Sequence, residues 1–222
     1  PYRLITSPYW NYFSVYSPDE QKIAFESDRS GNLGIYVCNR NGSDPRRITS
    51  LETYSGKPRW SPCGKYIILD SEPKGHGDIK NCDIIKVDIH NINRPVNLTD
   101  HPADDCMPSW SRDGRSIYFG SKRSGDYQIY KMSADGGEPR QITKNGGLFG
   151  FESFDSAYLY YRKFIQSEGH RGPIHRINLI TLEESMVIEE NVWPFQWSVE
   201  KEGVYYIAPD KDDHPILKLY HQ

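Results

Sequence analysis

The chain has 222 residues and a formal net charge of −3, and charged residues make up 26% of it. This charge argues against a general nucleic-acid binder, whose phosphate contacts need a basic face, and no apolar run is long enough to span a membrane. The 16 Tyr, 5 Trp, 18 Gly and 15 Pro residues suit short strands and tight turns, because aromatic side chains fit pleated surfaces and Gly and Pro favour turns.

Taken in chain order, the predicted elements repeat. A short strand, RLITS, comes at 3–7; a turn and a strand then occupy 16–27 (YSPDEQKIAFES), followed by a third strand (IYVCNRNG) and a fourth (RRITS). The turn and strand recur at 60–71, 110–121, 152–163 and 197–208. Their shared serines are 44, 50, 42 and 45 residues apart: Ser17, Ser61, Ser111, Ser153 and Ser198. Four short strands in a repeat of about 40–50 residues are typical of a β-propeller blade.

The two ends of the chain complement each other. The last copy ends at its third strand, whereas 3–7 is a fourth strand without the first three. Fourth-strand threonines recur 43, 50 and 44 residues apart: Thr6, Thr49, Thr99 and Thr143. Pairing the ends would remove two exposed sheet edges. The sequence therefore predicts one all-β domain, 1–222: a β-propeller of five four-stranded antiparallel blades, closed by the N-terminal strand. The predicted blades cover about 8–49, 50–100, 101–144, 145–190, and 191–222 together with 1–7.

Two of the copies, at 16–49 and 110–143, resemble the WD40-like (PD40) repeats of the TolB type. That pattern runs W-S-P-D-G-x-x-I-A-F, then S-D-R-x-G, I-Y and R-x-L-T, and the likeness covers nearly the whole chain. The fourth copy departs most, with Glu152 in place of Trp and 162–173 in place of the S-D-R-x-G segment. Since known TolB propellers have six blades, the alternative is that this chain is part of a six-bladed TolB-like propeller.

The resemblance implies a propeller that usually binds other proteins. The same repeats also occur beside enzymes, as in the propellers of dipeptidyl peptidases and tricorn-like proteases. The resemblance favours a periplasmic or extracellular location, although the sequence leaves the compartment open.

The residues that the copies share are predicted to be structural. Asp28 and Arg29 in SDRSG, and the corresponding Lys122 and Arg123, belong to a recurring hairpin loop in which Asp side chains bond backbone amides. The tryptophans at one repeat position are expected to pack between blades: Trp60, Trp110 and Trp197.

Binding is instead predicted on residues that the copies do not share. The loops from fourth to first strands and from second to third strands open on one face of a propeller, here called the loop face. The ligand-binding candidates predicted there are Tyr9, Trp10, Tyr54, His76, His101, Asp104, Asp105 and His170, with His214 nearby. Aromatic side chains among hydrogen-bonding groups suit a protein or sugar surface.

No metal, cofactor or catalytic residue is predicted. Adjacent carboxylates such as Asp104 and Asp105 point apart on an extended chain, whereas Ca²⁺ needs six or more oxygens. The chain lacks G-x-S-x-G, H-E-x-x-H and a Gly-rich phosphate loop. Cys82 and Cys106 lie in predicted loops of neighbouring blades, so the sequence leaves open whether they form a disulfide.

The sequence therefore favours a non-enzymatic scaffold whose loop face binds a protein partner or an extended ligand such as a glycan. It is either a monomeric propeller or a domain of a larger protein. One alternative is a carbohydrate-active enzyme, a glycan hydrolase or lyase with paired carboxylates in the channel. The segments predicted as first strands carry a single acid, Glu152, which argues against this alternative. Another alternative is a substrate-gating propeller attached to a catalytic domain outside this chain.

Overall fold

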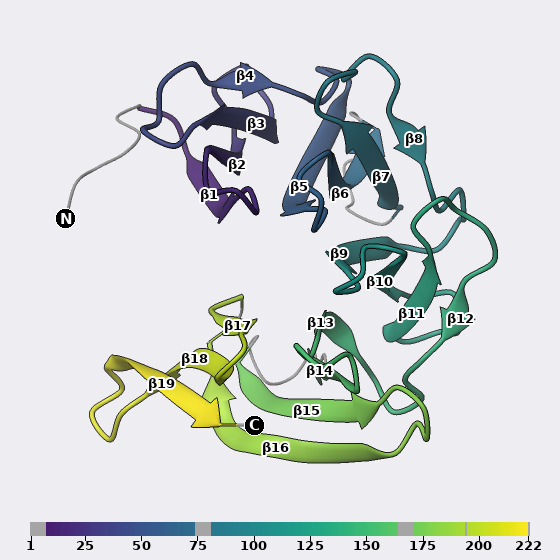
Figure 1. Ribbon diagram of the computed structural model, residues 1–222, viewed down its shortest axis with the longest axis vertical. Helices are drawn as coiled ribbons and strands as arrows, with labels where there is room; N and C mark the ends of the chain where they lie inside the picture. The colour runs from purple at the N-terminus through teal and green to yellow at the C-terminus, as the bar shows by residue number, and fades with distance from the viewer. Residues whose placement is uncertain (1–7, 74–80, 164–170, 194, 222) are drawn as a thin grey trace.

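The predicted all-β propeller is confirmed. A computed structural model of the protein describes residues 8–73, 81–163, 171–193 and 195–221. Within these ranges every helix-or-strand element is a strand, and the strands form five antiparallel sheets, or blades, that follow one another around a centre (Figure 1). No helix in the described part of the chain is long and apolar enough to cross a membrane.

Each blade is an up-and-down sheet whose strands pair in sequence order. Blade 1 contains β1 (Asn11–Tyr16), β2 (Lys22–Ser27), β3 (Gly34–Asn39) and β4 (Arg46–Arg47). Blade 2 contains β5 (Thr53–Trp60), β6 (Tyr66–Pro73), β7 (Asp83–Asp88) and β8 (Val96–Asn97). Blade 3 contains β9 (Asp105–Trp110), β10 (Ser116–Ser121), β11 (Gln128–Ser133) and β12 (Arg140–Gln141). Blade 4 contains β13 (Leu148–Glu152), β14 (Tyr158–Arg162), β15 (Gly172–Asn178) and β16 (Glu184–Val192).

Blade 5 has three strands in the described part of the chain: β17 (Trp197–Val199), β18 (Gly203–Pro209) and β19 (Pro215–His221). Its Ile216 pairs with β18 as Ile35 pairs with β2, yet Ile216 is 41% exposed and Ile35 is fully buried. The predicted fourth strand, 3–7, lies outside the described residues, so closure by that strand stays a prediction. In Figure 1 blades 1 and 5 face each other across the opening of the ring.

The repeat serine organises the turn between the first two strands of a blade. In blade 1, Ser17 Oγ donates to Asp19 Oδ1 at 2.6 Å and accepts the Lys22 N–H at 2.9 Å. The Asp19 carboxylate also accepts the Gln21 N–H at 3.1 Å. Blades 3 and 4 repeat this turn with Ser111–Asp113 and Ser153–Asp155, both at 2.6 Å. The repeated serine and aspartate therefore mark a turn that is held by the same hydrogen bonds in three blades.

Blade 2 departs from this turn, because Cys63 stands where the turns of blades 1, 3 and 4 have Asp, 3.3 Å from Ser61 Oγ. We expect Cys63→Asp to raise the free energy of unfolding by about 0.5–1.5 kcal/mol, since it supplies the missing carboxylate acceptor. Urea unfolding measures the gain. Cys63→Ala is the control and should show none. Equal stability of Cys63→Asp and Cys63→Ala would contradict the role assigned to the turn.

The threonine that follows the fourth strand closes each of blades 1 to 3. In blades 1 to 3 the threonine Oγ1 accepts the backbone N–H of the isoleucine at the second position of the third strand. These Thr–Ile pairs are Thr49–Ile35 at 3.1 Å, Thr99–Ile84 at 2.8 Å and Thr143–Ile129 at 2.9 Å. The threonine period found in the sequence thus marks a contact between the last two strands of a blade.

Neighbouring blades share their hydrophobic cores, and the predicted packing role of the tryptophans is confirmed. Trp60 Nε1 donates to the Val15 carbonyl at 3.2 Å, and Trp110 Nε1 donates to the Arg59 carbonyl at 3.1 Å. Each bond joins one blade to the blade before it. Trp197 is 6% exposed and packs edge-to-face on Phe151 of blade 4 at 4.9 Å.

The S-D-R-x-G loop also has the structural role predicted for it. Asp28 Oδ1 accepts the Trp10 N–H at 3.0 Å, and the Arg29 guanidinium lies over the rings of Phe25 and Tyr36, 5.0 and 4.9 Å from their centroids. In blade 3, Arg123 likewise lies over the rings at the corresponding strand positions.

Candidate binding site in the central channel

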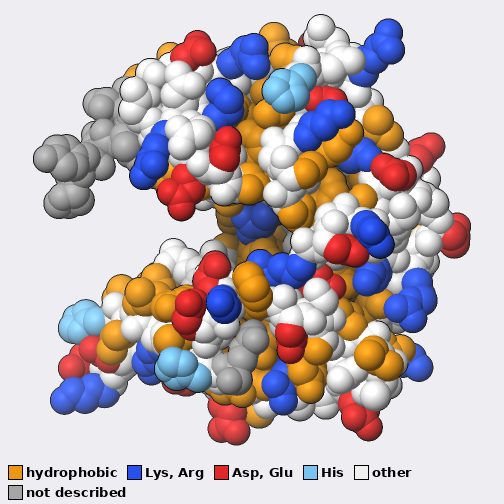
Figure 2. All heavy atoms as spheres, in the orientation of Figure 1, with side chains coloured by type: hydrophobic (Ala, Val, Ile, Leu, Met, Phe, Trp, Pro, Cys, Tyr) orange, Lys and Arg blue, Asp and Glu red, His pale blue; other side chains and the backbone are white. Residues whose placement is uncertain are grey.

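The inner strands present different side chains at one shared position, two residues before the repeat serine. These residues are Val15, Arg59, Ser109, Phe151 and Gln196. The first four line one pocket of about 600 Å³, together with Trp110, Trp197 and residues of the turns that follow the inner strands. Figure 2 shows Lys or Arg and hydrophobic side chains at the centre of the ring. We call this space the channel pocket. It lies at the turn end of the inner strands, away from the loop face.

A left-handed residue recurs four residues before the serine in blades 1 to 4. Phe13, Lys57, Met107 and Phe149 have φ values of 45°, 53°, 54° and 60°. At each of these places the pairing of the inner strand with its neighbour shifts register. Left-handed non-Gly residues cost about 1–3 kcal/mol each and persist where the surroundings hold them. These bulges therefore carry a cost in stability, and each lies two residues before a residue that lines the channel pocket.

Buried carboxylates hold two of the bulges, each from the blade before. Glu26 Oε1 accepts the Lys57 N–H at 2.5 Å, and Asp70 Oδ2 accepts the Met107 N–H at 3.1 Å. Glu26 is 2% and Asp70 6% exposed. Sequence reasoning missed both, because it searched the loops. The signal was an acid near the end of an otherwise apolar strand, in IAFES and IILDS.

The repeat position of these acids is a glycine in blade 3. A Cβ at Gly120 would clash with Leu148 Cδ1, so Leu148 of the next blade occupies the space that a side chain would need. Gly56 leaves room for the two carboxylates, since a Cβ there would lie 3.0 Å from Glu26 Oε1 and 3.1 Å from Asp70 Oδ1. The two carboxylates thus approach the same stretch of β5 from neighbouring blades.

Strand β5 carries two cations, Lys57 and Arg59, and Arg59 lines the channel pocket. Burial alone would lower the pKa of Lys57, but Asp70 and Glu26 outweigh it and raise that pKa. Burial lowers the pKa of Arg59 to about 10, with Glu26 and Asp70 opposing the change. Burial also raises the pKa of Glu26 and of Asp70. Both cations stay charged at neutral pH, and Lys57 Nζ lies 3.7 Å from Glu26 Oε1.

Aromatic rings surround these cations. The Arg59 guanidinium lies 5.4 and 5.2 Å from the centroids of Phe149 and Phe151, and Lys57 Nζ lies 4.8 Å from that of Phe13. Phe195 contacts both Phe13 and Phe149 edge-to-face, at 5.2 and 5.3 Å, so the aromatic cluster joins blades 1, 4 and 5. Cations over aromatic faces are stabilised without a counter-ion.

The loop-face candidates divide into exposed and buried groups. Tyr9, Trp10 and Tyr54 are 47%, 65% and 38% exposed and lie at the starts of the inner strands of blades 1 and 2. They present apolar surface on that face, and their role in binding stays a prediction. His76 and His170 lie outside the described residues.

Asp104, Asp105 and His101 make contacts within the protein. Asp104 is 7% exposed and accepts the Cys82 N–H at 3.1 Å as well as the Tyr127 hydroxyl. Asp105 is fully buried and bonded to Arg123 at 2.8 Å. His101 Nδ1 accepts the Ala103 N–H at 2.9 Å. These contacts give the three side chains a structural role.

Cys82 and Cys106 are free thiols in this structure, and both are buried in one hydrophobic cluster with Phe149 and Trp197. Burial is the largest cause raising the pKa of each thiol. Because the thiolate is the reactive form, both groups are held in their unreactive state.

The inner strands carry two acids, one more than the sequence prediction, because β9 begins at Asp105. Glu152 is 5% exposed; its Oε1 accepts the Tyr118 hydroxyl at 3.0 Å and its Oε2 accepts the Arg112 N–H. Glu152 lines the channel pocket, but both of its carboxylate oxygens are engaged, and Asp105 is paired with Arg123. The two acids therefore do not form the free pair of carboxylates that a channel glycosidase uses.

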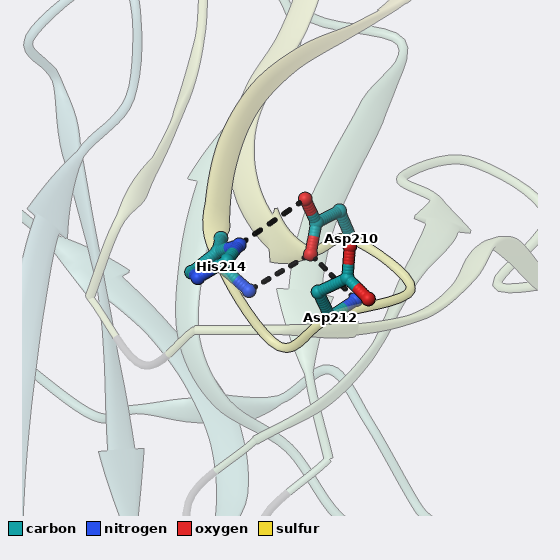
Figure 3. A group of neighbouring side chains, drawn as sticks. All are labelled: Asp210, Asp212 and His214. Carbon is teal, nitrogen blue, oxygen red and sulfur yellow. Dashed lines mark hydrogen bonds and ion pairs between the residues drawn. The ribbon is translucent and has the colours of Figure 1, made fainter.

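A further cluster, Asp210, Asp212 and His214, lies in the hairpin loop between β18 and β19 (Figure 3). Asp210 Oδ1 accepts the N–H groups of Asp212 and His214 at 2.8 and 2.9 Å, and His214 Nδ1 lies 3.7 Å from Asp210 Oδ2. Asp212 and His214 are exposed. The hydrogen bonds of the turn account for this arrangement.

Known proteins share these repeats, although no family model matches the chain. A TolB homolog of Chlorobaculum tepidum is 37% identical over 127 residues, 57% of this chain and 27% of that protein. The Tol-Pal system protein TolB of Desulfosudis oleivorans is 31% identical over 128 residues, 58% of this chain and 28% of that protein. An uncharacterized peptidase of Bacillus subtilis, YuxL, is 28% identical over 159 residues, 70% of this chain and 21% of that protein.

Solved structures support the same fold. TolB from Acinetobacter baumannii superimposes with a TM-score of 0.77 and 20% identity, covering 98% of this chain and 53% of that one. A puromycin-hydrolyzing peptidase of Mycobacterium tuberculosis gives a TM-score of 0.73 at 17% identity, covering 94% of this chain and 35% of that one. The predicted resemblance is thus confirmed: the chain has TolB homologues, TolB structural neighbours and a five-bladed propeller consistent with the TolB-type family of WD40-like repeats.

Proposed function

We propose that this chain is a non-enzymatic propeller scaffold that binds a protein partner, as a component of a Tol-Pal type system. The observation that carries the proposal is its similarity to two TolB proteins, one of them named for the Tol-Pal system. Because the chain spans about a quarter of each, the partner and the system are inferred from proteins that are much longer.

The channel pocket supplies a binding surface of the right kind. Aromatic and Arg side chains are enriched at protein interfaces, and this pocket combines Trp110, Phe151, Phe195 and Trp197 with Arg59. Phe195 is 39% exposed and also borders a second pocket, of about 560 Å³, between blades 1 and 5. An extended segment of a partner would enter here, while the exposed aromatics of the loop face offer a second surface.

Photocrosslinking tests this proposal. p-Benzoylphenylalanine is placed at Phe195 for the channel pocket and at Trp10 for the loop face, in cells of the source organism. The matched control is Val96, which is 48% exposed on the outer strand β8. We expect a discrete crosslinked protein from Phe195, identified by mass spectrometry, and none from Val96. Crosslinking at Phe195 and Trp10 no stronger than at Val96 would refute the scaffold proposal.

A second candidate function is a substrate-gating propeller beside a hydrolase domain outside this chain. The similarity to the peptidase YuxL over 70% of the chain favours it. Its test is the complete protein: hydrolysis of aminoacyl amides by a protein with an adjoining catalytic domain would support it. A complete protein without such hydrolysis would leave the scaffold as the function.

A further inference from the structure

Three buried polar atoms at the channel pocket lack hydrogen-bond partners among the described residues. They are Arg59 Nε, Ser109 Oγ and Trp197 Nε1, and all three side chains line the pocket. Buried polar atoms are nearly always paired, so each exception calls for an explanation. Two of these atoms are obligate donors and the serine hydroxyl is a third donor. The pocket is therefore matched to a ligand that brings acceptors.

Among the three tryptophans at this repeat position, Trp197 has the unpaired N–H. Trp60 and Trp110, at the same repeat position, donate to the carbonyls of Val15 and Arg59 in the preceding blades. The repeat therefore usually pairs the indole N–H at this position. The missing partner of Trp197 is a local feature of blade 5. It occurs on the side of the channel where Trp197 packs on Phe151.

Arg59 forms no ion pair of its own with the described residues, although Glu26 and Asp70 act on its charge from outside the pocket. Lys57, in contrast, has an ion pair with Glu26. The acid Glu152 lines the same pocket as Arg59, but its carboxylate is bonded to Tyr118 and Arg112. The Arg59 guanidinium rests on Phe149 and Phe151 and keeps part of its surface exposed. A charged group held on aromatic faces, beside unpaired donors, is oriented before a ligand arrives.

We infer that Arg59, with Ser109 and Trp197, binds a carboxylate of the protein partner. The guanidinium fork matches a carboxylate in a bidentate geometry, and carboxylates are the anionic groups of an unmodified peptide at neutral pH. The aromatic side chains of the pocket, such as Phe151 and Trp197, would cover the partner's side chain next to this carboxylate. This inference rests on the proposed function and adds the chemistry that the partner must present. The carboxylate belongs either to an acidic side chain or to the C-terminus of the partner.

Titration of the ¹⁵N-labelled chain tests the inference. The probes are N-acetyl-phenylalanine, which carries a carboxylate, and its neutral amide. The readout is the indole N–H signal of Trp197, with that of Trp10 on the loop face as reference. We expect a saturable shift of the Trp197 signal and at least 10-fold tighter binding of the acid than of the amide. Equal binding of acid and amide by the folded chain overturns the inference.

Variants locate the effect. Arg59→Gln should weaken binding of the acid about 10-fold or more, and Arg59→Lys should retain part of it, since the charge stays but the fork is lost. Arg46→Gln, on the exposed outer strand β4, removes the same charge and should bind as the unmodified chain does. If Arg59→Gln fails to fold, Ser109→Ala carries the test with an expected loss of about 3-fold. Unchanged binding in a folded variant overturns the inference.

Two blocked dipeptides identify the source of the carboxylate. N-acetyl-phenylalanyl-aspartyl amide has a side-chain carboxylate alone, and N-acetyl-asparaginyl-phenylalanine has a terminal one alone. Binding of either supports the inference and assigns the source. Phenyl phosphate that shifts the Trp197 signal where neither dipeptide does would overturn it in favour of a phosphate ligand.

The failure of this inference is distinguishable from failure of the proposed function. If the Phe195 crosslink forms equally well in Arg59→Gln, the carboxylate contact is wrong and the scaffold proposal stands. If Phe195 and Trp10 both crosslink no more than Val96 while the acid still binds selectively, the anion site stands and the partner proposal is wrong.

Discussion

Glu26→Ala is expected to lower the free energy of unfolding by about 3–5 kcal/mol, the usual cost of breaking a buried ion pair. The carboxylate is 2% exposed and accepts the Lys57 N–H, which belongs to a left-handed residue. Its removal leaves that buried amide without this acceptor and the Lys57 ammonium without its closest counter-charge. Urea unfolding followed by tryptophan fluorescence measures the loss.

Glu26→Gln is the matched control, because its amide oxygen can still accept the N–H. Since burial raises the pKa of Glu26, the folded chain binds a proton at this carboxylate more tightly than the unfolded chain does. The stability that protonation contributes is complete below the unfolded-state pKa of about 4.3 and is lost as pH rises through the higher folded-state pKa. We therefore expect the unmodified chain to lose stability relative to Glu26→Gln across that window. A loss below about 1 kcal/mol in Glu26→Ala would contradict the role assigned to the carboxylate.

Deletion of residues 1–7 is expected to lower the free energy of unfolding by about 5 kcal/mol. The sequence predicts that 3–7 complete blade 5, which would add several backbone hydrogen bonds at about 1 kcal/mol each. Burial of Ile216 would add about 1.5–3 kcal/mol. In the described blades the equivalent isoleucines are at most 1% exposed, against 41% for Ile216. Urea unfolding measures the loss, and amide exchange at Ile216 reports whether the edge of β19 opens.

Two point variants accompany this deletion. Thr49→Val removes a hydroxyl that accepts the Ile35 N–H, and it should cost about 1 kcal/mol. Thr6→Val should cost the same if the N-terminal strand is the missing fourth strand. An unchanged unfolding midpoint in both Thr6→Val and the deletion would mean that 3–7 do not close the ring. The alternative of a six-bladed propeller would then be favoured.

The channel pocket was not predicted, although its residues share one place in the repeat. Sequence reasoning looked for binding residues in loops, because loops vary between copies. Val15, Arg59, Ser109 and Phe151 vary as much, but they lie on strands. Each of them follows a bulge by two residues, and the four side chains line one pocket. Asp104 and Asp105 were predicted to bind a ligand because they are polar residues in a predicted loop. In the structure both are buried and bonded within the protein.

The sequence by itself determined the blade, because its turns and strand ends are local. Ser17 and Asp19 satisfy the amides of their own turn, and Thr49 closes its own blade, so their spacing is visible in the chain. The tertiary structure alone decided what the channel contains. The acceptor of the Lys57 N–H is Glu26, 31 residues away in another blade, and Arg59 acquires its aromatic surroundings from blade 4. Burial and charge at these places depend on how neighbouring blades face each other, and no local pattern encodes that arrangement.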